Sequence, residues 1–273
     1  MNGFSEIVIC GVDLGSYGED LNPYRQDSGG RHPMPESEPE NKFDLVDLLE
    51  ELLLLEYDAE NPFRIRLSSI DPHHLSDRLF DLMARECRIC PHIHLSLQSG
   101  NTLILKRMKR RYNADHVRER ISVLRSRIPH LVISADVMVG FPTETYEQYL
   151  DTEQMLKDIG VAFPHTFSYS EREGTPAAKI PQVKQVPIAE RKTRNARLRK
   201  VGQQIRTALL NKCLGKTAYV LSERKSKLEG FNLCRAEDYL AVLVPSSQIK
   251  EAQWQKVRYI DIAGERLVAQ ACE

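Results

Sequence analysis

The chain has 273 residues, of which 41% are hydrophobic and 28% charged, and its 38 basic side chains balance its 38 acidic ones. This length can build one large or two modest domains, and the composition excludes a disordered, collagenous or membrane-spanning chain. The longest apolar run, residues 239–244, is far shorter than the roughly 20 residues that cross a bilayer. Residues 1–11 lack the basic start of a signal peptide, so we expect a cytoplasmic protein.

Strand-like runs alternate with helical patterns along most of the chain. Strands are predicted at residues 7–12, 63–69, 92–97, 131–139 and 162–169. Helices are predicted from apolar stripes over residues 43–55, 75–85 and 114–128. Because strand and helix alternate, the pattern predicts a parallel sheet, either open or part of a barrel, with binding loops at the carboxyl ends of its strands.

Turn-forming residues gather at those carboxyl ends, in residues 11–18, 68–72, 98–100 and 140–144. Any one of these loops could simply end a strand, but four on one rim favour a functional edge. The polar, proline-rich stretch 22–41 predicts a mobile surface insertion.

Residues 188–211 predict one long helix with a basic face. Between Arg191 and Lys212 the sequence has eight bases and no acid, which is unusual for a merely solvated helix. This run favours contact with RNA or another phosphate-bearing ligand. The candidate RNA-binding residues are Arg191, Lys192, Arg194, Arg197, Arg199 and Lys200.

From about residue 211 to 273 the pattern changes to short strand-like runs without helices, at residues 217–221, 239–244, 257–262 and 266–269. This pattern predicts a small all-β module, a barrel. Its aromatic side chains could stack on nucleobases, but most of them are expected in its core. They are Tyr219, Phe231, Tyr239, Trp254 and Tyr259.

Six cysteines are too few for a disulfide scaffold of this length, so we expect reduced thiols. Cys87 and Cys90 alone have the spacing of metal ligands, and a zinc site would need two nearby histidines as well. On an alternating strand His92 and His94 share one face, where they could line a cavity without holding a metal. We therefore assign no metal ligand from the sequence, and a zinc-dependent enzyme is the weakest alternative.

Six segments, in order along the chain, resemble the radical S-adenosylmethionine methylthiotransferases. They are residues 11–18, 64–72, 91–100, 105–112, 136–144 and 169–178. The first segment most resembles the branch that methylthiolates threonylcarbamoyladenosine beside the anticodon of tRNA. The resemblance implies an α/β fold: a partial radical-SAM-type (β/α) barrel without its first strand over residues 1–210, then a TRAM-like RNA-binding β-barrel over residues 211–273.

The same resemblance implies a site for S-adenosylmethionine. Met138, Gly140 and Glu144 correspond to the fifth-strand motif that cradles the adenine of this cofactor. Ser69, Gln98 and Ser99 lie at strand ends where cofactor or substrate contacts are expected. The plainer alternative for Glu144 is an acid at the start of a helix, stabilised there by the helix dipole.

One departure from the family matters most. The family anchors a catalytic four-iron four-sulfur cluster on a C-x-x-x-C-x-x-C motif, and this sequence has no such spacing. Cys87 and Cys90 cannot replace it, because they lie in another unit and lack the third thiolate. We therefore expect a chain that begins at the family's second strand and lacks cluster ligands and catalytic residues. Such a chain would be poorly soluble alone or would assemble with a separately encoded N-terminal cluster-bearing segment.

The sequence thus predicts a tRNA-modifying methylthiotransferase that is incomplete and inactive alone. In the complete enzyme, the resemblance implies that a deoxyadenosyl radical takes the hydrogen from carbon 2 of the modified adenine and a methylthio group replaces it. The alternatives are a cluster-free tRNA-binding remnant or one half of a split enzyme. Neither DNA nor a membrane is expected as a partner. The free edge of the strand at residues 7–12 should invite pairing with another chain.

Overall fold

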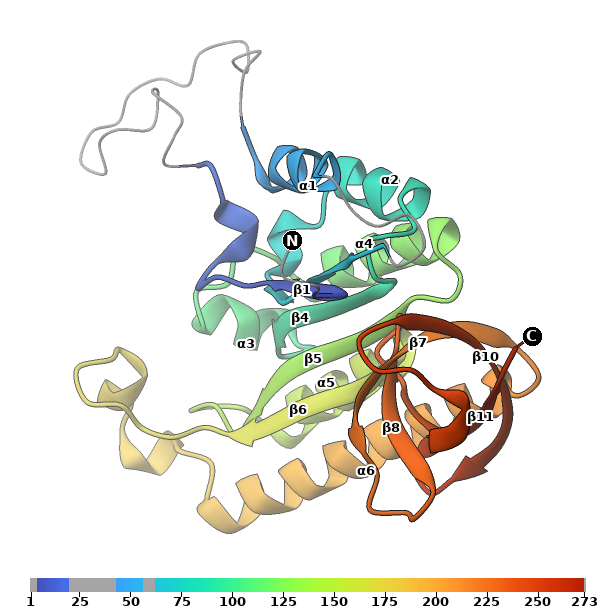
Figure 1. Cartoon of the computed structure of the whole chain (residues 1–273). Helices are drawn as coiled ribbons and strands as arrows, with labels where there is room; N and C mark the ends of the chain where they lie inside the picture. Colours follow the sequence, from blue (N-terminus) through green and yellow to red (C-terminus); the bar gives the residue numbers. More distant parts are fainter. Residues whose placement is uncertain (1–3, 20–42, 56–61, 273) are drawn as a thin grey trace.

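The computed structural model describes residues 4–19, 43–55 and 62–272. These residues form a parallel sheet covered by helices, followed by a closed β-barrel (Figure 1). Both parts of the predicted fold class are confirmed. The insertion expected at residues 22–41 lies outside the described residues.

The sheet consists of two adjoining parallel parts. Strands β1 (Glu6–Ile9) and β2 (Arg64–Leu67) pair with each other. The second part has the order β3-β4-β5-β6, with bounds Ser69–Ile70, His92–Gln98, Val132–Val139 and Val161–Ser168. Only Ser68 separates β2 from β3, and its N–H donates to the carbonyl of Ile9. The strands therefore follow one another in space in their chain order, as the alternating pattern predicts.

Six α-helices are described, and five of them begin at polar capping residues: Asp44, Ser76, Asn101, Asn113 and Thr145. The first five are α1 (Leu45–Leu53), α2 (Asp77–Arg85), α3 (Thr102–Arg107), α4 (Ala114–Arg127) and α5 (Tyr146–Asp158). The long helix α6 spans Ile188–Cys213 and packs against β6. Among the described helices, none combines the length and apolar character that crossing a bilayer would require.

Strand alternation gives the sheet an apolar face and a polar face. On β4, Ile93, Leu95 and Leu97 are fully buried in the core shared with the helices. His92 and His94 alternate with them and therefore project to the opposite face. The shared face predicted for these two histidines is thus observed.

The barrel closes through five strands in the order β10-β11-β9-β8-β7. Their bounds are β7 Thr217–Lys225, β8 Phe231–Ala236, β9 Ala241–Pro245, β10 Trp254–Ala263 and β11 Arg266–Ala271. Strand β8 had no counterpart among the predicted strands. Of the predicted aromatic residues, Tyr259 and Trp254 are buried, Phe231 and Tyr239 are half-buried, and Tyr219 is exposed.

The barrel is seated against the first residues of the sheet strands. The indole N–H of Trp254 donates to the carbonyl of Ser5 over 2.7 Å, just before β1. Arg66 on β2 donates to the carbonyls of Ala236 and Glu237 in the barrel. The ring of Tyr239 stacks on His92 with centroids 4.3 Å apart. These contacts leave the carboxyl ends of the strands, at the other edge of the sheet, free of the barrel.

Candidate functional site

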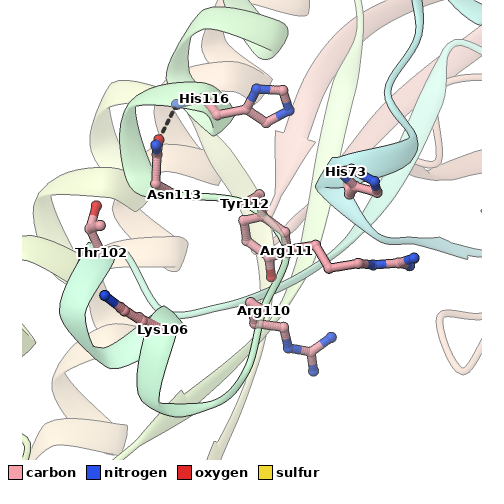
Figure 2. Close-up of a pocket in the computed structure, with 8 residues that line it drawn as sticks. All are labelled: His73, Thr102, Lys106, Arg110, Arg111, Tyr112, Asn113 and His116. Carbon is pink, nitrogen blue, oxygen red and sulfur yellow. Dashed lines mark hydrogen bonds between the residues drawn. The ribbon is translucent and has the colours of Figure 1, made fainter. Parts of the chain in front are cut away.

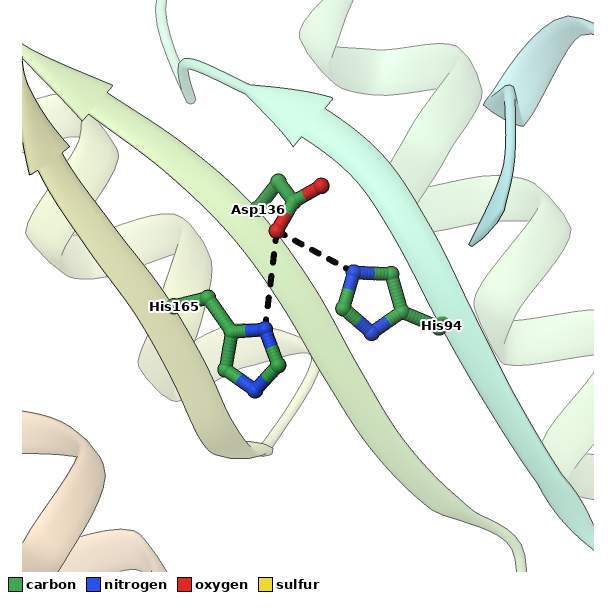
Figure 3. A group of neighbouring side chains, drawn as sticks. All are labelled: His94, Asp136 and His165. Atoms are coloured by element: carbon green, nitrogen blue, oxygen red, sulfur yellow. Dashed lines mark ion pairs between the residues drawn. The ribbon is translucent and has the colours of Figure 1, made fainter. Parts of the chain in front are cut away.

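The polar face of the sheet carries a cluster of side chains from three neighbouring strands (Figure 3). Asp136 on β5 lies between His94 on β4 and His165 on β6. One of its carboxylate oxygens is 3.2 Å from Nε2 of His94 and 3.6 Å from Nδ1 of His165. Sequence analysis placed His94 on this face but did not identify Asp136 or His165. Only the pairing register of β5 with β6, which sets Asp136 opposite His165, brings these two together.

A hydroxyl links this cluster to a second, deeper histidine. Oγ of Ser134 lies 2.8 Å from Nδ1 of His94 and 2.9 Å from Nε2 of His92. Burial, reinforced by the charge of Arg66, lowers the pKa of His92 well below its ordinary value. Hydrogen bonds from His165 and His94 hold the pKa of Asp136 well below its usual range. At neutral pH the face therefore presents a neutral His92 and an ionised Asp136.

The end of β5 and the loop after it hold three of the predicted cofactor residues, with Met138 on the strand and Gly140 and Glu144 in the loop. Oε2 of Glu144 accepts hydrogen bonds from the N–H of Gly140 over 2.7 Å and from Arg194 over 2.8 Å. Oε1 of Glu144 is buried without a hydrogen-bond partner among the described residues. Burial raises the pKa of Glu144. Met138 packs beside the cluster of Ile104, Phe141 and Tyr169. Glu144 thus fixes the shape of this loop.

Gly140 adopts a φ of +72°, in the left-handed region that favours glycine. A Cβ at this position would overlap the aliphatic part of Arg191. Arg191 is itself held in place, since it donates to the carbonyls of Val186 and Tyr169. Both the backbone conformation and the packing therefore require glycine here.

The other three cofactor candidates lie at the ends of β3 and β4. Ser69 is paired with His94 in the ladder of β3 and β4. Gln98 is buried and has a φ of +63°, which marks a strained strand end. Oγ of Ser99 lies 3.2 Å from Oγ1 of Thr152 on α5 and accepts from the N–H of Asn101. Ser99 is fully buried, so its hydroxyl joins the loop to α5.

A separate cavity of about 430 Å³ opens beside α3 and the start of α4 (Figure 2). Its lining is predominantly basic and consists of His73, Thr102, Lys106, Arg110, Arg111, Tyr112, Asn113 and His116. Arg110 pairs with Asp71 and Arg111 with Asp13, both at 3.3 Å. The hydroxyl of Tyr112 donates to the carbonyls of Ser96 and Leu97, at the end of β4. This cavity suits an anion, and it lies on the rim formed by the carboxyl ends of the strands.

Four of the six predicted basic residues of α6 are engaged by other groups of the chain, two of them by acids. Arg194 is 6% exposed and bonds to Glu144 and Glu190, while Arg197 pairs with Glu153. Arg191 is tied to backbone carbonyls, and Arg199 donates to Oγ1 of Thr166. Lys192 and Lys200 are exposed, and neither forms an ion pair within the described part of the chain.

The cysteines do not gather into a cluster site. Cys10 and Cys87 are exposed, whereas Cys90 is buried and its pKa is raised to about 12 by that burial. Within the described residues, the one group of three metal-ligating side chains is His94, Asp136 and His165, without a thiol. A four-iron four-sulfur cluster with three thiolate ligands therefore does not fit the described residues.

Comparisons with known proteins show which families this chain resembles. Residues 36–156 match the model of the radical SAM superfamily. A threonylcarbamoyladenosine tRNA methylthiotransferase of Rickettsia prowazekii is 37% identical over 244 residues, covering 89% of this chain and 52% of that protein. A tRNA-2-methylthio-N(6)-dimethylallyladenosine synthase of Geobacillus thermodenitrificans is 33% identical over 225 residues, covering 82% of this chain and 38% of that protein. The chain therefore spans about half the length of these relatives, or less.

Among solved structures, the coproporphyrinogen III oxidase of Escherichia coli, a radical SAM enzyme, superposes with a TM-score of 0.42. The sequence identity of that pair is 17%, and the match covers 62% of this chain and 36% of the oxidase.

Proposed function

We propose that this chain, a radical SAM protein related to the methylthiotransferases, is the cofactor-binding and RNA-binding portion of a tRNA methylthiotransferase. Its substrate would be threonylcarbamoyladenosine beside the anticodon, methylthiolated at carbon 2 of the adenine. The observation that carries the proposal is the 37% identity to a threonylcarbamoyladenosine enzyme over 89% of the chain. A cytoplasmic location agrees with a tRNA substrate.

In this proposal the rim formed by the loops after β3, β4 and β5 holds S-adenosylmethionine. When bound, one molecule of this cofactor would supply the deoxyadenosyl radical, and a second molecule would supply the transferred methyl group. Gly140 gives the loop after β5 its left-handed turn, and the hydrogen bond from its N–H to Glu144 keeps this loop in one shape. Ser69, Gln98 and Met138 lie at the strand ends of the same rim, whereas Ser99 supports it through Thr152.

The iron–sulfur cluster that starts radical chemistry would have to be held by residues other than those described. We propose that the chain does not methylthiolate tRNA by itself and that a separate cluster-bearing segment completes it. Strand β1 supports this, because in the described part it pairs only with β2 and its residues Ile7 and Val8 are exposed. A free parallel edge of this kind is suited to accept another strand.

For the RNA, we propose that phosphates contact the exposed side of α6. Lys192 and Lys200 carry this part of the proposal because they are exposed and unpaired within the described residues. Arg197 and Arg199 flank them on the same exposed surface. Arg191 donates to the carbonyl of Tyr169 just after β6, and Arg194 donates to Glu144, so both would act as supports.

The catalytic part is tested in a bacterial strain without its own threonylcarbamoyladenosine methylthiotransferase. The chain is expressed alone, or with a fragment of the Rickettsia relative that covers the region this chain does not match, and tRNA nucleosides are analysed by mass spectrometry. We expect 2-methylthio-threonylcarbamoyladenosine only from the pair, with the intact relative as positive control. Product from the chain alone would refute its inactivity. Absence of product from the pair would favour the tRNA-binding remnant.

RNA binding is tested separately by filter binding of tRNA to the purified chain across a salt series. The variant Lys192→Ala/Lys200→Ala should lower the slope of log affinity against log salt by about two, one for each lost phosphate contact. The control Arg85→Ala/Arg118→Ala removes the same charge from α2 and α4 and should leave the slope unchanged. Equal slopes in the lysine variant and the wild type would remove α6 from the interface.

A further inference from the structure

Three ligand-bearing side chains converge on the polar face of the sheet without any assigned role. They are His94, Asp136 and His165 (Figure 3). One potential ligand atom of each lies within 4.8 Å of those of the other two. They come from three adjacent strands, so the sheet ladder, and not a mobile loop, sets their separation. We propose that this cluster binds a divalent transition-metal ion, Zn²⁺ in the first instance.

The separations suit such an ion. Zinc takes imidazole nitrogen and carboxylate oxygen at about 2.0–2.2 Å in a tetrahedral arrangement, which sets neighbouring ligand atoms about 3.3–3.5 Å apart. The carboxylate oxygen of Asp136 is 3.2 Å from Nε2 of His94 and 3.6 Å from Nδ1 of His165. The remaining separation, between the ligand nitrogens of His94 and His165, is at most 4.8 Å, so the exposed His165 ring would rotate to complete the set. The carboxylate of Asp136 supplies an oxygen ligand that carries negative charge, as a divalent cation requires.

The ring of His94 is already oriented for this role. A metal-bound histidine characteristically donates its second ring N–H to a neighbouring acceptor, which fixes both the tautomer and the ring plane. Here Oγ of Ser134 lies 2.8 Å from Nδ1 of His94, and the same oxygen lies 2.9 Å from Nε2 of His92. If Nδ1–H of His94 donates to Ser134 and Ser134 donates to neutral His92, then Nε2 of His94 directs its lone pair toward Asp136.

The site would be open on one side. The side chain of His165 is 56% exposed and that of Asp136 is 31% exposed, whereas His94 is 13% exposed. Three protein ligands leave at least one coordination position for water or for a nitrogen or oxygen donor of a ligand, as in zinc sites that are not purely structural. Two histidines and one carboxylate also suit other divalent ions of the first transition row.

The plain alternative is a hydrogen-bonded triad in which protons take the place of the ion. In that arrangement Nε2–H of His94 donates to Asp136, and His165 donates from Nδ1. The two arrangements differ in heavy-atom positions by the rotation of the His165 ring, and a binding measurement distinguishes them. The site contains no cysteine, so a spectroscopic probe separates it from adventitious binding at the exposed thiols of Cys10 and Cys87.

The test uses the full chain, freed of metal with a chelator and titrated with Co²⁺ as a coloured probe and with Zn²⁺ by calorimetry. We expect one ion per chain, with visible Co²⁺ bands and no thiolate charge-transfer band in the near ultraviolet. His165→Ala and Asp136→Asn should abolish this binding. Ser134→Ala should weaken it by about 10–100-fold, because it removes the support of one ligand. The matched control His130→Ala changes an exposed histidine outside the cluster and should bind normally.

The proposal is overturned if the wild-type chain takes up no stoichiometric ion, or if His165→Ala binds as tightly as the wild type. Loss of binding in Cys10→Ser/Cys87→Ser would overturn it too, because the ion would then be on the thiols. His165 is exposed, so its variant should keep the circular dichroism and melting temperature of the metal-free wild type. If it does not, the variant Asp136→Asn, which keeps the size of the half-buried side chain, provides the same comparison. None of these readouts depends on tRNA or on methylthiolation.

Discussion

Replacing Arg194 with alanine separates a structural role of the basic helix from a role in RNA binding. The guanidinium of Arg194 donates to Oε2 of Glu144 over 2.8 Å, and the Glu144 side chain is fully buried. In the variant, this carboxylate keeps only the N–H of Gly140 as a hydrogen-bond donor among its described contacts. The second partner of Arg194, Glu190, is 38% exposed and can be solvated by water instead.

The expected loss follows from leaving a buried charge uncompensated. Removing one partner of a buried ion pair costs about 3–5 kcal/mol of the free energy of unfolding, against about 0–1 kcal/mol for a surface pair. Burial already raises the pKa of Glu144 and Arg194 opposes that rise, so the pKa should climb further in the variant. At pH values above its raised pKa, the ionised Glu144 destabilises the folded state. The loss of free energy of unfolding in the variant should therefore shrink as the pH falls and Glu144 is protonated.

Urea denaturation at pH 7.5, followed by circular dichroism, measures this loss. The matched control is Lys200→Ala, on the same helix but exposed, which should stay within about 0.5 kcal/mol of the wild type. The double variant Glu144→Gln/Arg194→Ala should recover part of the loss, because the buried group is then neutral. A free energy of unfolding for Arg194→Ala within 0.5 kcal/mol of the wild type would refute the reasoning. Weaker tRNA binding by a fully stable Arg194→Ala chain would point to RNA contact instead.

Two further predictions concern the loop after β5 and the seat of the barrel. Gly140→Ala should destabilise the chain by about 1–3 kcal/mol, because the residue needs a positive φ and its new methyl group would displace Arg191. Thermal unfolding measures this loss, and an unchanged melting temperature would contradict the prediction. Burial raises the pKa of Asp238 from 3.8 to about 6. The ionised side chain therefore destabilises the folded state fully above pH 6, and this destabilisation decreases as the pH drops toward 3.8. Asp238→Asn keeps the acceptor for the N–H of Leu240 and should stabilise the chain by up to about 3 kcal/mol at pH 8 and about half that at pH 5. A pH-independent difference in urea denaturation would contradict this cause.

The elements that depend on local spacing could be predicted from the sequence. The alternation of strand and helix led to the parallel sheet, because each strand buries an apolar run and each helix an apolar stripe. The two-residue period placed His92 and His94 on one face. The helix-free pattern after residue 211 led to the barrel, although β8 (Phe231–Ala236) was missed. In its sequence FNLCRA the polar residues Asn232 and Arg235 fall out of strict alternation with the apolar ones, so it gives a weak strand signal.

The candidate sites depended on contacts between segments far apart in the chain. The acid-free run of bases on α6 is visible in the sequence. The acids that pair with it, Glu144 and Glu153, come from the loop after β5 and from α5. Likewise, His94, Asp136 and His165 are separated by more than 25 residues each, and strand register alone brings them together.

The sequence by itself determined the kinds of elements, their order and the resemblance to radical SAM methylthiotransferases, because periodicity and motif order are local properties of the chain. Only the tertiary structure decided which charges are neutralised and which ligands meet. Pairing of distant residues depends on strand register and helix packing, and neither leaves a local signal in the sequence.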